Sequence, residues 1–192
     1  MYALSNKVND IQYEVIDKKV KENRSDIYNL WYNVYCREMG RNILYADHKN
    51  CQITDSLEPH SYIIVAKIHN IVIGSFRINL PEDGDVSYYN ELYNLDAIDK
   101  RTIGIGTRYM VLSPYRGLYI SQYMMAEAFR LLSEKDKKTL IIDCSPAVFK
   151  LFEKMGFADL LEERRITEYG SVRIMKYDIK KLKKNNYYIV GE

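Results

Sequence analysis

Cysteine, histidine and proline are scarce in this sequence of 192 residues, which contains three, three and four of them. Three scattered cysteines do not make the disulfide framework of a small secreted protein, and they favour a reduced, cytoplasmic setting. The first ten residues, MYALSNKVND, contain no basic segment followed by an apolar one. We therefore expect no secretory signal and a cytoplasmic protein.

Long apolar runs and an excess of one charge are also missing. No window approaches the roughly 18 apolar residues of a membrane span, so we expect none. The 28 basic side chains are almost balanced by 26 acidic ones, which argues against a nucleic-acid binder. Without repeats or low-complexity linkers, the chain is predicted to form a single domain over residues 1–192, with a basic tail at 180–192.

Alternating apolar and polar residues predict strands, and apolar residues three and four positions apart predict helices. His69-Asn70 separates two predicted strands as a hairpin turn, because asparagine tolerates the positive φ of tight turns. The predicted elements are a strand at 11–16, a helix at 26–40, strands at 61–68 and 71–80, a short helix at 88–99, a strand at 108–112, a helix at 118–135, a strand at 139–144, a helix at 146–157 and a second hairpin around Gly170.

The stretch best suited to chemistry is SPYRG, residues 113–117, between the predicted strand 108–112 and the helix that follows. The first N–H groups of a helix have no intrahelical partners, so such a turn can bind a phosphate or a developing oxyanion. Arg116 adds a positive charge there, and Gly117 permits close backbone approach. An ordinary connection between a strand and a helix stays open as the alternative.

Acidic and histidine side chains before residue 61 offer candidates for a general base. Glu38 falls in the last turn of the predicted helix 26–40, where the helix dipole disfavours a carboxylate; a solvated surface role stays open. His60, with an ordinary pKa near ~6.5, ends a long polar connection, and it too can be plain surface. The potential metal ligands match no standard zinc or calcium spacing, so no metal site is predicted; they are Asp47, His48, Cys51 and Asp55.

SPYRG before an amphipathic helix, together with CSPAVFKLFEKMGF at 144–157, resembles the GNAT superfamily of N-acyltransferases. There a (Gln/Arg)-x-x-Gly-x-(Gly/Ala) loop holds the pyrophosphate and pantetheine of acyl-coenzyme A. The resemblance implies an α/β (α+β) fold with a mixed, mostly antiparallel central sheet flanked by helices, and no permanently bound cofactor. It implies donor binding by Met110, Val111, Leu112, Arg116, Gly117, Leu118, Tyr119, Ile120 and Ser121.

The front half is similar to the long-chain N-acyl amino acid synthases and, more distantly, to the N-acyl homoserine lactone synthases. Those enzymes take the acyl chain from an acyl carrier protein. In the lactone enzymes an acidic residue commonly precedes the Ser/Thr-Arg pair, whereas Gly104-Ile105-Gly106 stands there in this sequence. That absence weakens the lactone interpretation. The matched positions are Glu38, Asp47, Asp55, Arg77, Arg108 and Arg116.

Two departures from the family pattern concern the donor. Tyr119 and Ser121 stand where the loop usually has glycine and glycine or alanine. A tyrosine there is expected to crowd the pyrophosphate of coenzyme A, whereas a carrier protein presents phosphopantetheine with a single phosphate. We therefore favour a carrier-protein donor, unless Tyr119 packs away from it. Phe152 replaces a tyrosine that often protonates the departing thiolate, and phenylalanine has no proton to give.

The implied mechanism is direct attack of an amine on the thioester, whose carbonyl is polarised by a backbone N–H near Val111 or Leu112. Glu38 is the first choice of base, followed by Asp55 and His60. An acceptor carboxylate is expected to pair with Arg77 and Arg108, for which structural salt bridges are an equally good account. Cys144 is predicted to be a buried, inert thiol rather than an acyl carrier.

We expect transfer of an acyl group, a long one, to the amine of an amino acid. Fatty acylation of a lysine or ornithine side chain on a peptide, short-chain acetyl transfer and a non-catalytic acyl-thioester binding module are the alternatives. The chain length rests on apolar residues that can line a tunnel or simply fill the core: Met110, Met124, Met125 and Phe129. The lysines of the tail can steer an acidic acyl carrier protein or only aid solubility.

Overall fold

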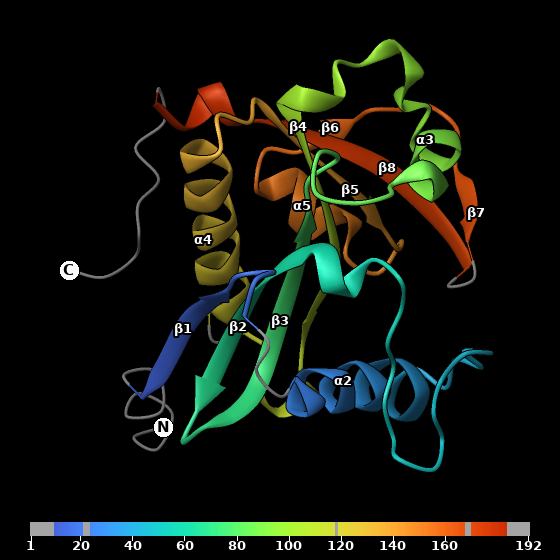
Figure 1. Cartoon of the computed structure of the whole chain (residues 1–192), viewed down its shortest axis with the longest axis vertical. Helices are drawn as coiled ribbons and strands as arrows, with labels where there is room; N and C mark the ends of the chain where they lie inside the picture. Colours follow the sequence, from blue (N-terminus) through green and yellow to red (C-terminus); the bar gives the residue numbers. More distant parts are fainter. Residues whose placement is uncertain (1–9, 21–23, 118, 168–169, 184–192) are drawn as a thin grey trace. The chain divides into compact units, whose positions relative to one another are not determined.

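The computed structural model describes residues 10–20, 24–117, 119–167 and 170–183 (Figure 1). The chain divides into two compact units, each built from separated segments. Unit 1 consists of Met1–Ile78 and Arg108–Ala128, and unit 2 of Asn79–Thr107 and Phe129–Glu192. Strand β4 and helix α4 each contribute residues to both units. Every residue of the predicted active site belongs to unit 1.

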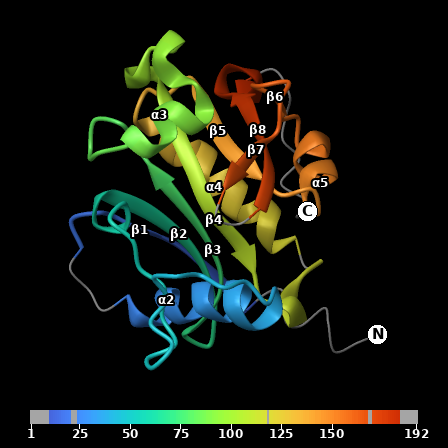
Figure 2. The same cartoon turned by 90° about the vertical axis from the view of Figure 1, so that its right-hand side faces the viewer.

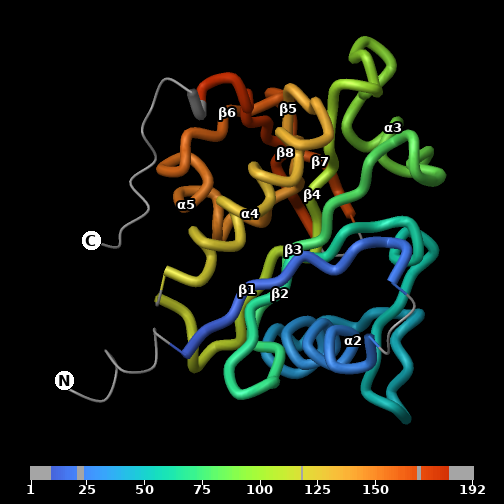
Figure 3. Tube along the Cα trace, turned by 60° about the vertical axis from the view of Figure 1, so that its left-hand side comes forward, coloured from blue at the N-terminus to red at the C-terminus, as the bar shows by residue number. Residues whose placement is uncertain are grey.

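The strands of unit 1 lie in sequence order, and Figure 3 shows β1 running beside β2. Strands β1 and β2 are antiparallel, with Ile11 opposite Ile68. The predicted hairpin turn between β2 and β3 is confirmed: His69 and Asn70 both have a positive φ, of 49° and 64°. The strands are β1 (Ile11–Ile16), β2 (Ser61–Ile68), β3 (Ile71–Asn79) and the last residues of β4 (Ile103–Val111).

Two helices cover the two faces of this sheet within unit 1 (Figures 1 and 2). On one face lies α2 (Ser25–Tyr32), whose buried Trp31 donates a hydrogen bond of 2.9 Å from its indole nitrogen to Ser75 Oγ on β3. On the other face lies the first part of α4 (Ile120–Glu134). There Gly74 of β3 packs closely, because an added Cβ would come within 3.2 Å of the Met124 side chain and of the Met110 carbonyl.

The predicted helix 26–40 changes character part-way. After α2 the chain continues as a π-helical segment, η1 (Asn33–Glu38), and the Met39 N–H bonds the Val34 carbonyl five residues back. Gly40, with a φ of +62°, then ends the helix, as the sequence predicted. A π turn holds one residue more than an α turn, so the residues after it are rotated out of the α-helical stripe. Glu38 is the last residue of η1.

Unit 2 combines one parallel strand pair with antiparallel ones. The first residues of β4 run parallel to β5 (Thr139–Cys144), from Ile103 opposite Thr139 to Gly106 opposite Ile142. The other pairs are antiparallel: β8 pairs with β5, with β6 and with β7. They are β6 (Ala158–Asp159), β7 (Arg165–Thr167) and β8 (Gly170–Asp178). The mixed, mostly antiparallel strand arrangement is therefore confirmed.

The helices of unit 2 are shorter than the sequence predicted. The region 88–99 forms α3 (Ser87–Tyr93) and a single 3-10 turn, and the region 146–157 forms only α5 (Phe149–Lys154). An aromatic core holds this part together, with ring centroids of Phe129 and Tyr177 4.5 Å apart. Gly104 on β4 has a packing reason, because a Cβ there would meet Leu132 of α4.

Short 3-10 turns connect several elements, and they are η2 (Glu58–His60), η3 (Leu95–Ala97), η4 (Lys100–Thr102), η5 (Ser113–Tyr115) and η6 (Ile179–Lys183). The predicted strand 108–112 is the end of a longer strand that begins at Ile103. No helix in the described part of the chain is both long and apolar enough to cross a membrane. The tail beyond residue 183 lies outside the described residues.

Candidate active site

A single carboxylate, that of Asp55, joins two buried arginines. Arg77 Nη1 on β3 donates to Asp55 Oδ1 at 2.5 Å, and Arg108 Nη2 on β4 donates to Asp55 Oδ2 at 2.8 Å. The arginine side chains are only 2% exposed, and that of Asp55 is 18% exposed. Buried guanidinium groups require such a partner. The structure thus brings together three predicted site residues from three separate segments.

Aromatic rings enclose the Arg108 guanidinium. Its central carbon lies 5.2 Å from the Trp31 ring centroid and 5.1 Å from that of Tyr35. Arg108 Nη2 also donates to the Tyr45 hydroxyl at 2.9 Å. The negative faces of the rings stabilise the cation in a place that water reaches poorly. None of these three aromatic side chains was predicted from the sequence to be part of the site.

The charges around Asp55 set its ionisation. Burial favours the neutral acid, but the guanidinium groups of Arg77 and Arg108 outweigh burial and lower the pKa of Asp55 below its ordinary value. Asp55 therefore remains a carboxylate at neutral pH. A group with a lowered pKa holds a proton weakly, which makes it a poor general base.

The backbone at Arg108 is held in an unusual conformation. Its φ is +54°, in the left-handed region that non-glycine residues rarely occupy. The Ser75 hydroxyl donates to the Arg108 carbonyl at 3.1 Å and supports this conformation. A left-handed residue within a strand turns the chain locally, so it helps aim the Arg108 side chain at Asp55. The sequence contains no glycine or asparagine here to signal it.

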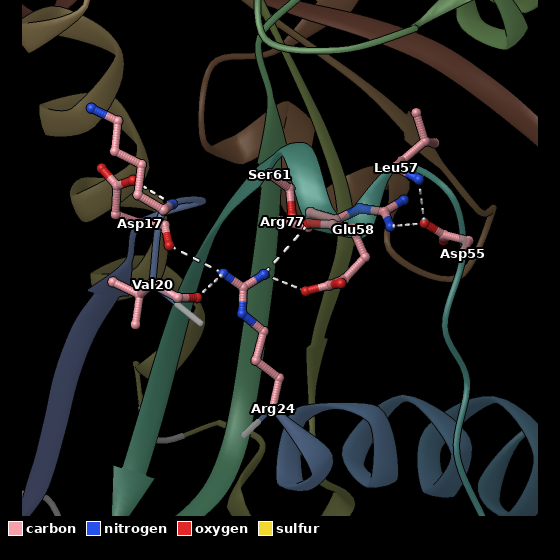
Figure 4. Close-up of polar contacts among 9 residues, drawn as sticks. Asp17, Val20, Arg24, Asp55, Leu57, Glu58, Ser61 and Arg77 are labelled. Carbon is pink, nitrogen blue, oxygen red and sulfur yellow. Dashed lines mark hydrogen bonds and ion pairs between the residues drawn. The ribbon is translucent and has the colours of Figure 1, made fainter. Parts of the chain in front are cut away.

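A second buried ion pair, missed by the sequence analysis, fixes the segment next to Asp55 (Figure 4). Arg24, at the start of α2, pairs with the Glu58 carboxylate and donates hydrogen bonds of 3.1 Å to the Asp17 and Val20 carbonyls. The Ser61 hydroxyl donates to the Glu58 carbonyl at 2.6 Å. Arg24 and Glu58 are 34 residues apart, so no local sequence pattern indicates that they pair. Burial and the Glu58 carboxylate also raise the pKa of Tyr28 to about 12.

Glu38 contacts the loop to which donor binding was assigned. Its carboxylate accepts a hydrogen bond of 3.1 Å from the Ser113 backbone N–H and forms an ion pair with Arg116. Arg116 Nε also donates to the Val111 carbonyl at 2.9 Å. The first-choice base and the cation of the predicted phosphate-binding loop are therefore direct partners. The side chains are 24% and 51% exposed, so solvent reaches both.

The start of α4 is organised by Tyr119. Its carbonyl accepts hydrogen bonds from the Gln122 and Tyr123 N–H groups, and its φ of +60° is left-handed. The Tyr119 side chain is 51% exposed, and Gly117 also has a positive φ, of +83°. Leu118, assigned to the donor site, lies outside the described residues.

The next two residues of α4 are held from within unit 1. Ile120 is buried, and the Ser121 carbonyl accepts a hydrogen bond of 2.6 Å from the Tyr109 hydroxyl. Burial raises the pKa of Tyr109 above its ordinary value, so this hydroxyl stays protonated. The first turn of α4 is thereby tied to strand β4.

The end of β4 distinguishes between the two predicted oxyanion donors. The Leu112 N–H donates to the Ile73 carbonyl on β3 at 2.9 Å, so it is already engaged. Successive N–H groups of an extended chain point in opposite directions, so the Val111 N–H points away from β3. Val111 and its neighbour Met110 are both buried, at 8% and 6% exposure.

The remaining polar candidates of residues 41–60 do not join these clusters through any described contact. His60 is exposed at the end of η2. Asp47 bonds Asn50, His48 Nδ1 lies 3.0 Å from the Tyr32 hydroxyl, and Cys51 Sγ accepts from Arg37 at 3.2 Å. Within the described residues, no three of His, Cys, Asp and Glu gather in a way that could hold a metal ion.

Two residues of unit 2 bear on the chemistry. Cys144 is 2% exposed, and its burial, assisted by the Asp143 charge, raises its pKa to about 11. A buried thiol with a raised pKa is a poor nucleophile, which argues against an acyl-cysteine intermediate. Phe152 is also buried, and its ring packs edge-on against Phe157 with 5.2 Å between centroids.

No protein-family model and no curated protein matches the sequence. Solved structures do resemble it. BjaI, a CoA-dependent acyl-homoserine lactone synthase solved with SAM and isopentyl-CoA, is 14% identical with a TM-score of 0.71, covering 88% of this chain and 83% of its own. The homoserine lactone synthase LasI is 13% identical with a TM-score of 0.69, covering 95% and 97%.

A Lactobacillus plantarum protein described as an N-acetyltransferase is also similar, at 13% identity and a TM-score of 0.64, covering 89% of this chain and 99% of its own. The chain has the GNAT fold. This confirms the fold predicted from SPYRG and the 144–157 segment, and its likeness to the homoserine lactone synthases. At these identities the likeness establishes the fold and not the reaction.

Proposed function

We propose that this GNAT-fold protein is an N-acyltransferase that moves a long acyl group from a phosphopantetheine thioester to the amine of an amino acid. One observation carries the proposal. The Glu38 carboxylate is bonded to Ser113 and Arg116, in the loop where the sequence pattern predicts donor binding. An acid–base group beside a cationic loop is the arrangement that acyl transfer to an amine requires.

The proposed reaction is a direct attack. The substrate amine adds to the thioester carbonyl, whose oxygen becomes an oxyanion that accepts a hydrogen bond from the Val111 N–H. The C–N bond forms, the C–S bond breaks, and the proton of the amine passes to the base. The thiolate leaves unaided, because a thiol with a pKa near ~8.5 is a good leaving group. This accommodates Phe152, which has no hydroxyl.

Glu38 is the proposed base. Asp55 is less suited, because Arg77 and Arg108 lower its pKa. His60 stays a weaker candidate, since its exposed position at the end of η2 gives it no described contact with Arg116 or Arg108. Glu38 lies against the loop itself, where the thioester is expected.

The cluster around Arg108 is the proposed acceptor site. Arg108 and Arg77 present buried guanidinium groups, and the rings of Trp31 and Tyr35 flank Arg108. Guanidinium groups bind carboxylates in two-pronged fashion, so this cluster suits an acceptor that carries a carboxylate. These features support an amino acid as acceptor.

The donor is proposed to be an acyl carrier protein, with acyl-coenzyme A as the alternative. Tyr119 in the loop supports the carrier protein, because its side chain adds bulk where a pyrophosphate would sit. BjaI, of the same fold, is CoA-dependent. The two donors share the phosphopantetheine arm, so the loop contacts proposed here serve either one.

The test is a donor panel. Matched C2, C8 and C16 acyl thioesters, on coenzyme A and on acyl carrier protein, are incubated with a pool of amino acids and lysine- or ornithine-containing peptides, and amides are detected by mass spectrometry. We expect an amide from the long-chain carrier-protein donor and an amino acid. Product from acetyl-coenzyme A alone would identify a short-chain acetyltransferase. Donor binding without any amide would identify a non-catalytic binding module.

A further inference from the structure

The anion-binding position of the loop is occupied by the protein itself. The Ser113 N–H and the Arg116 guanidinium converge on one carboxylate, that of Glu38. A backbone N–H beside an arginine is a typical site for a phosphate oxygen. Glu38 comes from η1, 75 residues earlier in the chain than Ser113, so the contact is tertiary and not a local turn.

We propose that the donor phosphate displaces Glu38 from Arg116 and that this displacement releases the carboxylate to act as the base. The inference rests on the proposed function, and it adds an order of events. While Glu38 is bound to the loop, each of its oxygens is held by a loop donor, Oε1 by the Ser113 N–H and Oε2 by Arg116. Once the phosphate replaces it, the carboxylate is available to the amine.

The ion pair is suited to such an exchange. Its side chains are 24% and 51% exposed, and ion pairs that solvent reaches are weak. A phosphate offers several charged oxygens to a guanidinium group and competes well with one carboxylate. Arg116 keeps a second anchor during the exchange, because its Nε donates to the Val111 carbonyl at 2.9 Å. The cation can therefore stay in place while its anionic partner changes.

The exchange also makes the base available only after the donor has bound. Without a donor, an amine in the acceptor site meets no base. With the donor phosphate seated, the base is released close to the strand end that binds the thioester. The structure therefore predicts ordered addition, with the donor first and the acceptor second.

The test measures donor affinity and rate separately in Glu38→Gln. Binding of free phosphopantetheine, a non-reacting probe that carries the shared arm with its single phosphate, is followed by calorimetry. Removal of the competing carboxylate is expected to tighten probe binding about 1.5-fold to fivefold, the effect of one exposed ion pair. Amide formation is expected to fall about 100-fold or more, because the base is lost. A residue with only a structural role would not improve binding.

Two controls separate displacement from net charge and from misfolding. Glu14→Gln on β1 removes the partner of Lys67 on β2 and changes the net charge equally, and it is expected to leave probe affinity and rate unchanged. In an Arg116→Ala background, Glu38→Gln is expected to have no effect on probe binding, because the contested cation is gone. Glu38→Asp, which keeps the charge but shortens the side chain, is expected to bind the probe with intermediate affinity.

The inference is overturned if Glu38→Gln binds the probe no more tightly than the wild-type protein does. It is also overturned if Glu14→Gln tightens binding equally, or if neither the wild-type protein nor Glu38→Gln binds the probe. These outcomes are independent of turnover. If the wild-type protein forms no amide from any donor while Glu38→Gln still tightens probe binding, the displacement stands and the proposed reaction fails.

Discussion

Asp55 satisfies two buried cations at once, and this explains why its replacement is expected to be severe. Each of its oxygens accepts from a different guanidinium group, from Arg77 and from Arg108. Those arginines cannot reach bulk water to recover solvation. Loss of one shared carboxylate therefore leaves two charges without this partner, and such a loss costs more than the ion pair contributes.

Asp55→Asn is predicted to destabilise the protein by about 3–5 kcal/mol at pH 7. The folded pKa of Asp55 is lowered, so its contribution is fully present above the unfolded pKa of about 3.9 and is lost as the pH falls through the folded pKa. Urea unfolding at pH 7 and at pH 3 measures the difference between wild type and variant, which should shrink at the lower pH.

The control for that experiment is Asp47→Asn, a carboxylate that bonds Asn50 in the exposed loop before Asp55. It is expected to change the free energy of unfolding little at either pH. A similar loss in both variants would mean that the stability of the chain depends on its overall charge and not on the shared carboxylate.

Individual residues of the candidate site were picked out from the sequence where they match a position of the family pattern. Residues outside that pattern were missed where their partners lie far away along the chain. Asp55, Arg77 and Arg108 were selected from the family pattern, and they meet in space. Arg24 and Glu58 were missed, because nothing in a window around either residue indicates a partner 34 positions away. The roles of the selected residues in catalysis stay predictions.

At the scale of elements, the π-helical segment η1 decides where Glu38 points. An apolar stripe of period 3.6 predicted a continuous helix to Gly40, and it gave no sign of the extra residue in the turn. Strands 61–68, 71–80 and 139–144 were predicted close to their observed bounds, because each is a short apolar run rich in β-branched residues. The start of β4 was missed, because glycines such as Gly104 and Gly106 are uncommon within strands; packing against Leu132 accounts for Gly104.

Deletion of Cys36 from η1 is predicted to restore α-helical hydrogen bonding and to rotate the following residues by about 100°. Glu38 then leaves Arg116, and amide formation is expected to fall about 100-fold, as for loss of the base. Circular dichroism and the amide assay measure the two effects. Cys36→Ala, which keeps the number of residues, is expected to retain near wild-type rate, and an equal loss in this control would contradict the account.

At the scale of the whole molecule, each unit is made of two separated segments of the chain. Unit 1 needs residues from both sides of the 79–107 stretch, and unit 2 needs residues from both sides of the 108–128 stretch. The chain length predicted one domain, and the sequence contains no low-complexity linker. The single domain stays a prediction; the interleaving means that no single cut of the chain separates the two units.

A fragment of residues 1–107 is therefore predicted not to fold. It keeps Asp55 and Arg77 but lacks Arg108, the loop bound by Glu38 and the first part of α4. We expect no cooperative thermal transition by circular dichroism, whereas the full chain should show one. A cooperative transition in the fragment would show that its segments fold without residues 108–128.

The distance along the chain between Asp55 and Arg108 has a consequence for synthesis. The two residues are 53 positions apart, and a ribosome adds about 5–20 residues each second. For about 3–11 seconds, a growing chain thus carries Asp55 while Arg108 has not been made. The segment that carries Asp55 cannot reach its final position until the end of β4 leaves the exit tunnel. Unit 1 is therefore completed only after residue 128 has been made.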